Sequence, residues 1–158
     1  MDAERAGGMS DEPPAQVADP TDPSVRELRA ILGDARAIAV VGLSSDPMRE
    51  SYDIAAYLQE RGYRIIPVNP RETEVLGEKA YPTLRDVPEP IDVVDVFRRA
   101  ELTPEVAREA VEVGAKVLWL QSGIVSDEAY RIASEAGLDV IMGVCIRTAR
   151  RRVEREAS

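Results

Sequence analysis

Residues 39–58, AVVGLSSDPMRESYDIAAYL, combine an apolar run, a polar loop and the start of a helix-forming segment. A short β-branched run that ends at a glycine and leads into a helix is typical of a strand–loop–helix unit. A dinucleotide-binding unit would place G-x-G-x-x-G at this loop. This chain has only Gly42, followed by two serines and Arg49. The stretch therefore indicates an α/β protein, and its loop raises the question of the ligand.

Apolar runs of the same kind recur along the chain, separated by helical segments that end at glycines. The five runs are Ala37–Leu43, Tyr63–Val68, Ile91–Phe97, Lys116–Gln121 and Leu138–Met142. Runs that are apolar on both faces are typical of parallel strands covered by helices. We expect a Rossmann-like, doubly wound, parallel five-stranded sheet in three layers. The favoured strand order is 3-2-1-4-5, with the flavodoxin-like order 2-1-3-4-5 as the alternative.

The ordered domain is expected to begin at residue 24. Residues 1–23 are rich in Pro, Asp, Ala and Gly, lack apolar periodicity and are interpreted as a disordered acidic leader. Ser24 and Glu27 form a capping box that opens the first helix. Thr103, before Pro104, and Ser126 are expected to cap later helices. Residues 24–158 are then one domain that ends in an Arg-rich helix, interpreted as a solvated face.

Composition excludes several classes of function. The chain has no histidine and only one cysteine, Cys145, which excludes Ser-His-Asp triads, His-ligated metals and internal disulfides. The net charge of −9 argues against a general nucleic-acid binder. Apolar runs are too short for a membrane span, so we expect a cytoplasmic protein. With no evident catalytic or metal-binding residues, a binding role is favoured over an enzyme.

The loop after the first run has groups that suit phosphate. Ser44, Ser45 and Ser51 offer hydroxyl donors near the amino end of a helix, and the Arg49 guanidinium can bind a pyrophosphate with two hydrogen bonds. The alternative is that the serines only cap turns and that Arg49 is solvated. Both interpretations remain open from the residue types.

The end of the second run distinguishes between nucleotides. An NAD site would carry an acid there to bind the ribose hydroxyls. This chain has Asn69, Pro70 and Arg71, and the arginine suits a ribose phosphate, as in NADP or coenzyme A. A plain turn with Arg71 in water is the alternative.

Polar residues also follow the third and fourth runs. Gln121, Ser122 and Gly123 could bind a ligand amide, and the favoured strand order places them opposite the serine loop. Trp119 and Phe97 are interpreted mainly as core residues, and Cys145 as a small buried one rather than a redox group. Asp95 is expected to be buried and paired with a residue such as Arg98.

Several motifs in order resemble the small bacterial CoA-binding proteins. They are the VGxSxxPxRxSY loop at residues 42–52 (with its Val at 41), PVNP at 67–70, DVFR at 95–98 and GAKxLWxQxG at 114–123. These single-domain proteins are similar to the CoA-binding domain of the succinyl-CoA synthetase alpha subunit. The resemblance covers about residues 28–146. The chain differs from the family pattern after the last expected strand, where it has Cys145 but lacks the charged residues that flank this cysteine in the family.

The resemblance implies coenzyme A, or an acyl-CoA, bound at the carboxyl edge of the sheet. Gly42–Ser51 with Arg49 would hold the pyrophosphate, and Asn69, Pro70 and Arg71 would lie by the adenosine and its 3′-phosphate. Phe97 with Arg98, and Gln121–Gly123, would line the path of the pantetheine arm.

Three functions remain in competition. The leading one is a non-catalytic CoA carrier or sensor, acting alone, as a homo-oligomer or with a partner protein. The others are an NADP-binding redox protein or sensor, and a subunit of an acyl-CoA synthetase-type enzyme.

Overall fold

The fold is built around one parallel sheet, which we describe from a computed structural model over residues 16–157. The sheet strands are β1 (Ala37–Val41), β2 (Arg64–Val68), β5 (Val93–Val96), β6 (Val117–Leu120) and β7 (Asp139–Ile141). The helices are α2 (Val25–Asp34), α3 (Glu50–Glu60), α4 (Thr103–Glu112), α5 (Asp127–Glu135) and α6 (Ile146–Ala157). A small hairpin of β3 (Glu74–Val75) and β4 (Glu78–Lys79) and two short 3₁₀ helices, η1 (Leu84–Asp86) and η2 (Ala100–Leu102), complete the described elements.

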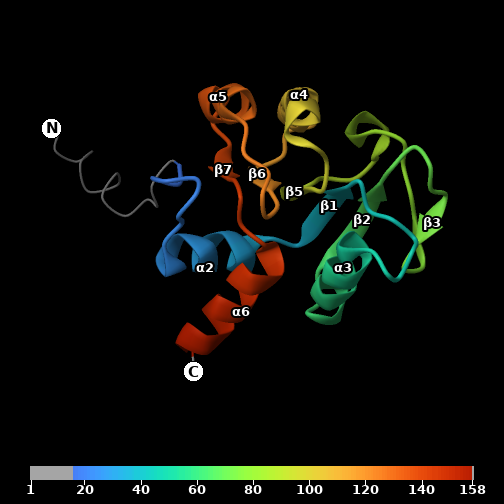
Figure 1. Cartoon of the computed structure of the whole chain (residues 1–158), viewed down its shortest axis with the longest axis horizontal. Coiled ribbons are helices and arrows are strands. Elements are labelled where there is room, and N and C mark those ends of the chain that lie inside the picture. Colours follow the sequence, from blue (N-terminus) through green and yellow to red (C-terminus); the bar gives the residue numbers. More distant parts are fainter. Residues whose placement is uncertain (1–15, 158) are drawn as a thin grey trace, which may run out of the picture.

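Helices cover both faces of the sheet. Figure 1 shows α4 and α5 on one side and α2, α3 and α6 on the other. Alternate residues of each strand enter one of two apolar clusters. One cluster packs under α2, α3 and α6, and the other packs under α4 and α5. The central strands β1, β5 and β6 are buried along their whole length, as parallel strands covered on both faces should be. The expected three-layer, doubly wound α/β fold is confirmed.

The favoured strand order, 3-2-1-4-5, is wrong for the five expected runs, and the alternative order is the one observed. The sheet runs β2-β1-β5-β6-β7, which is 2-1-3-4-5 when the five parallel strands are counted along the chain. The third run therefore pairs directly with β1, with Val41 opposite Val96. The outer position beside β2 is taken by a single parallel bridge from Tyr81 to Val68. That bridge lies in the irregular, proline-rich segment at residues 72–90, whose sequence predicts a short strand and one helical turn but does not specify the strand's partner.

Two of the three expected helix caps are present. Ser24 and Glu27 form the capping box of α2, and the Ser126 hydroxyl accepts a hydrogen bond from the Ala129 N–H at the start of α5. The cap at Thr103 is wrong, because η2 runs directly into α4. The Thr103 hydroxyl instead donates to the carbonyl oxygen of Ala100, at 2.7 Å.

The domain begins earlier than residue 24. Val17 is only 6% exposed and belongs to the apolar cluster under α2. The Pro20 carbonyl accepts a hydrogen bond from Met142 N–H at 2.8 Å, just past the edge strand β7. Residues 16–23 therefore pack on the domain, and the proposed leader is wrong for them. Residues 1–15 of that leader lie outside the described residues.

The Arg-rich helix α6 is more than a solvated face. Arg147 pairs with Asp53 of α3 at 2.7 Å, and Arg150 donates to the Tyr63 hydroxyl at 3.1 Å. Arg151 lies over the Tyr57 ring, 5.2 Å from its centroid. These contacts attach α6 to α3 and to the sheet, so the arginines have a structural role.

Candidate functional site

The loops at the carboxyl ends of the strands form the candidate site. The loop after β1 leads to α3 on one face of the sheet, whereas the loop after the adjacent β5 leads to α4 on the other. The chain thus diverges between β1 and β5, and such divergence points hold the ligands of open α/β sheets. The neighbour of the serine loop is consequently Phe97-Arg98. Gln121–Gly123 lie one strand further away, which corrects the expected arrangement.

Gly42 allows the ends of β1 and β5 to approach closely. Its φ is +90°, and a Cβ at this position would meet the carbonyl oxygen of Phe97 at 2.8 Å. Its N–H continues the ladder by donating to the Val68 carbonyl, at 2.8 Å. The single glycine of the loop is thus explained by strand packing, since any side chain there would collide with the neighbouring backbone.

Each hydroxyl of the loop forms a hydrogen bond within the protein, two of them as acceptors and one as a donor. The buried Ser51 hydroxyl accepts from Ser44 N–H at 3.1 Å, and the Ser44 hydroxyl accepts from Asp46 N–H at 3.0 Å. Ser45 donates both its N–H (2.9 Å) and its hydroxyl (3.1 Å) to one carboxylate oxygen of Glu72. The serines therefore shape the loop, and Glu72 occupies the donors of Ser45 that an anionic ligand would use. The sequence reading missed Glu72, although it follows Arg71 directly.

The end of β2 is tied to this loop by Asn69. Its amide nitrogen donates to the Leu43 carbonyl and its amide oxygen accepts from Arg71 N–H, both at 3.0 Å. These bonds give Asn69 a structural function that fixes the relative position of the two loops. Pro70 and Arg71 are exposed beside it.

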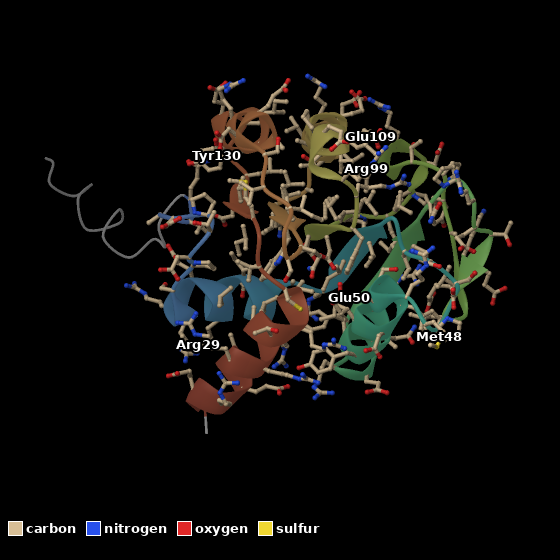
Figure 2. All side chains as sticks on the ribbon, in the orientation of Figure 1. Arg29, Met48, Glu50, Arg99, Glu109 and Tyr130 are labelled. Carbon is tan, nitrogen blue, oxygen red and sulfur yellow. The ribbon has the colours of Figure 1, made fainter. Side chains whose placement is uncertain are left out.

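Arginines stand at three adjacent strand ends. Arg49 precedes α3, Arg71 follows β2 and Arg98 follows β5. None of the three guanidinium groups forms a hydrogen bond or an ion pair with any residue of the described chain. They are thus available to a phosphate-bearing ligand. Met48, beside Arg49, is 90% exposed and projects from the loop (Figure 2).

A pocket of about 480 Å³ lies beside these groups. Its lining comes from the start of α3 and from the ends of β5 and β6: Glu50, Phe97, Arg98, Arg99, Ala100, Glu101, Gln121, Ser122, Gly123 and Ile124. Five predicted residues are among them, namely Phe97, Arg98, Gln121, Ser122 and Gly123. The other predicted residues, from the loops after β1 and β2, lie outside the pocket lining.

The lining also includes residues that the sequence reading missed. Glu50 and Arg99, labelled in Figure 2, bring opposite charges to the pocket, and Arg99 pairs with Glu101 at 3.7 Å. The run Phe97-Arg98-Arg99 at a strand end was the available signal for Arg99. No sequence signal distinguished Glu50 from other exposed acids. A smaller hollow of about 180 Å³ lies at the opposite, amino edge of the sheet.

A buried polar pair lies beneath the pocket. Asp95 is fully buried in β5, and one of its oxygens accepts from the Gln121 side-chain nitrogen at 2.5 Å. Its second oxygen, Oδ2, has no partner among the described residues. Burial raises the pKa of Asp95 to about 7, although the hydrogen bond from Gln121 acts to lower it. The expected partner, Arg98, is therefore wrong, because the carboxyl group is bonded to Gln121.

Three other candidates have structural explanations. Trp119 is fully buried and its indole N–H donates to the Val144 carbonyl at 2.8 Å, which confirms its core role. Phe97 and Cys145 are partly buried against the apolar cluster under α6. The Asp92 carboxylate accepts from the N–H groups of Arg36 and Ala37, each at 2.9 Å. Although burial opposes them, these bonds and the nearby Lys116 lower the pKa of Asp92.

Residues 16–157 contain neither a cluster of metal-binding side chains nor a helix that could span a membrane. No cluster of three or more His, Cys, Asp or Glu side chains in this part of the chain has the arrangement of a metal site. Among the helices described, none is long and apolar enough to cross a membrane.

Comparison with known proteins identifies the family. Residues 36–151 match the model of the CoA binding domain. The chain is 48% identical over 128 residues to the uncharacterized protein YneT of Bacillus subtilis, covering 81% of this chain and 95% of YneT. The solved structure of a hypothetical protein from Pyrococcus horikoshii is similar to this fold, with a TM-score of 0.81 and 40% sequence identity. The match covers 83% of this chain and 92% of that one.

A larger enzyme subunit contains a related segment. The alpha subunit of an ADP-forming acetate–CoA ligase from Pyrococcus furiosus is 30% identical over 122 residues, which cover 70% of this chain but only 27% of the subunit. The matched part thus amounts to about a quarter of that subunit's length. With a family match over most of its length, the chain belongs to the family of CoA-binding domains.

Proposed function

We propose that the protein binds coenzyme A or an acyl-CoA at the carboxyl edge of the sheet and acts as a non-catalytic carrier or sensor. The observation that carries this proposal is the set of three arginines at adjacent strand ends, Arg49, Arg71 and Arg98, whose guanidinium groups have no partner within residues 16–157. Coenzyme A carries a pyrophosphate and a 3′-phosphate, and charge-assisted hydrogen bonds from guanidinium groups suit both.

The pocket supports the same proposal from the other end of the ligand. Its volume of about 480 Å³ is within the usual range for small-molecule sites. Phe97 and Ile124 offer apolar surface, and Gln121 and Ser122 offer polar groups suited to the amides of a pantetheine arm. We propose that the phosphates lie over the loops of β1 and β2 and that the arm enters this pocket.

The end of β2 argues against NAD as the ligand. Asn69-Pro70-Arg71 has no carboxylate that would bind free ribose hydroxyls, and the carboxylate of the next residue, Glu72, is bonded to Ser45. Arg71 suits a phosphorylated ribose instead. NADP shares such a phosphate, so an NADP-binding redox protein is the competing function. A second alternative is a subunit that completes a ligase with a partner, which the similarity to the acetate–CoA ligase subunit favours.

The test is a calorimetric comparison of CoA, acetyl-CoA, dephospho-CoA, NADP and NAD on the full chain. We expect CoA and acetyl-CoA to bind most tightly and NAD not to bind. Dephospho-CoA should bind more weakly than CoA, and Arg71→Ala should abolish about 1 kcal/mol of that difference. Binding of NAD or NADP that equals or exceeds binding of CoA would contradict the proposal.

A further inference from the structure

Gln121 connects the pocket to the buried carboxyl group below it. Gln121 is among the residues that line the pocket, yet it is only 3% exposed. Its amide nitrogen donates to Asp95 of β5, and its amide oxygen accepts from Ile146 N–H, the first residue of α6, at 3.4 Å. One side chain thus joins two strands, a helix end and the pocket.

These two contacts define the orientation of the amide. A backbone N–H can only donate, so the Gln121 oxygen has to face Ile146. Above its pKa of about 7 the Asp95 carboxylate can only accept, so the Gln121 nitrogen then has to face it. A reversed amide would put two donors together at Ile146 and two acceptors together at Asp95. One N–H of the amide group is then left over after both contacts are made.

We propose that Asp95 is a positioning residue, which holds the Gln121 amide so that its second N–H donates to a carbonyl oxygen of the ligand in the pocket. The inference rests on the proposed CoA site, because the amide and thioester carbonyls of an acyl-pantetheine arm are acceptors of this kind. Asp95 itself does not reach the ligand, since it is not among the pocket-lining residues. Its effect passes through Gln121.

The position of Asp95 supports this role over a simple packing role. Its neighbours in register are Val40 on β1 and Trp119 on β6, and both belong to the apolar cluster. A carboxyl group with an unpartnered oxygen is costly in such surroundings, where an apolar side chain would be more stable. A polar residue at this point therefore needs another reason, and control of the Gln121 amide supplies one.

The pKa of Asp95 is set by burial and not by neighbouring charges. Ionisable groups on the elements that pack over this face include Asp53 on α3 and Cys145 and Arg147 at the start of α6, and Asp53 and Arg147 pair with each other. α2 contributes the apolar Leu28 and Leu32. Within the described chain no charged group contributes to the raised pKa of Asp95: burial raises it, and the hydrogen bond from Gln121 opposes that shift.

Two variants separate positioning from packing. Asp95→Asn is isosteric, but its amide can donate as well as accept, so of the two contacts only the one from Ile146 N–H, at 3.4 Å, still favours one orientation of the Gln121 amide. The double variant Asp95→Asn with Gln121→Glu keeps a hydrogen bond between the two positions and an acceptor for Ile146 N–H, yet it has no donor for the pocket. Ile141→Val, a conservative change in the same apolar cluster on β7, is the matched control.

The first readout is the affinity for CoA, measured by calorimetric titration at about pH 6 and about pH 8. We expect both variants to keep the fold, measured by circular dichroism, and to bind CoA about tenfold more weakly than the wild type. The control should bind like the wild type. Wild-type affinity in either variant would overturn the inference.

The second readout does not depend on CoA. The Gln121 side-chain amide signals in a ¹H–¹⁵N NMR spectrum should titrate with an apparent pKa near 7 in the wild type and stay constant in Asp95→Asn. Gln121 signals that do not respond to pH in the wild type would overturn the role of Asp95. A wild type that fails to bind CoA would contradict the proposed function, and the NMR titration would still decide whether Asp95 holds Gln121.

Discussion

The loop after β1 and the pair beneath the pocket are both polar, but they use their hydrogen-bonding groups differently. In the loop, the Ser51 hydroxyl accepts from Ser44 N–H, the Ser44 hydroxyl accepts from Asp46 N–H, and Ser45 donates to Glu72. Beneath the pocket, Asp95 keeps an unpartnered oxygen, and after its two contacts the Gln121 amide has an N–H to spare. A polar sequence is therefore a weak guide to available donors. Whether a polar segment can bind a ligand depends on which of its hydrogen-bonding groups the fold leaves unpaired.

The largest expected effect concerns the backbone that supports the loop. Gly42→Ala should destabilise the protein by about 3–5 kcal/mol, because the new Cβ would meet the Phe97 carbonyl at 2.8 Å and φ is +90°. Gly62→Ala is the matched control, with φ of +96° and nothing within 4 Å of the new Cβ. It should cost only about 1–2 kcal/mol. Urea unfolding measures both, and equal losses would contradict a packing role for Gly42.

The next prediction tests the buried carboxyl group of Asp95 through the dependence of stability on pH. Burial raises the pKa of Asp95 from 3.8 to about 7, so the folded state holds a proton that the unfolded chain releases in this interval. Stability should therefore fall by roughly 2–4 kcal/mol as pH rises from about 4 to about 7 and then level off. Asp95→Asn should lack this component of the slope.

Asp92→Asn is the control for this measurement. The pKa of Asp92 is lowered, so its contribution to stability is present above its unfolded value and is lost only as pH falls through the lower folded value. The slope between about pH 4 and about pH 7 should persist in this variant. Chemical unfolding at several pH values measures both slopes, and a wild type without the slope would contradict the raised pKa of Asp95.

The third prediction concerns the exposed cation of the loop. Arg49→Ala should weaken CoA binding by about 1.5–3 kcal/mol, or tenfold or more, because it removes a charge-assisted contact to phosphate. The fold should be unaffected, since the guanidinium has no partner among the described residues. Arg29→Ala, on α2 away from Met48 and Glu50 in Figure 2, is the control and should not alter affinity. Unchanged calorimetric affinity in Arg49→Ala would show that Arg49 is a solvated surface residue that does not contact the ligand.

The smallest expected effect tests whether removing the charge of Glu72 makes the Ser45 donors available to a ligand. Glu72→Gln removes the negative charge that accepts both donors of Ser45, so those donors should exchange more readily to a phosphate. We expect CoA affinity to rise about three- to fivefold, which is about 1 kcal/mol or less for exposed charges. Glu74→Gln, on β3, is the control for the change in net charge. Weaker binding in Glu72→Gln would show that Glu72 supports the ligand instead of competing with it.

Much of this structure follows from local patterns in the sequence. The alternation of short β-branched runs and capped helices predicted the three-layer α/β fold, because strand and helix periodicity are properties of neighbouring residues. The capping box at Ser24 and the polar residues that follow each strand were visible in the same way. Pocket residues such as Arg98 and Gln121 were predicted because the carboxyl ends of parallel strands share one edge.

Contacts between distant parts of the chain were decided only by the tertiary structure. The pairing of β5 with β1, the bridge at Tyr81 and the packing of Val17 join segments whose own sequences do not specify their neighbours. The same holds for Glu72 on Ser45 and for Gln121 on Asp95, which are separated by 27 and 26 residues. Local propensity fixes what each segment becomes, whereas burial and hydrogen-bond satisfaction, summed over the whole fold, choose its partners.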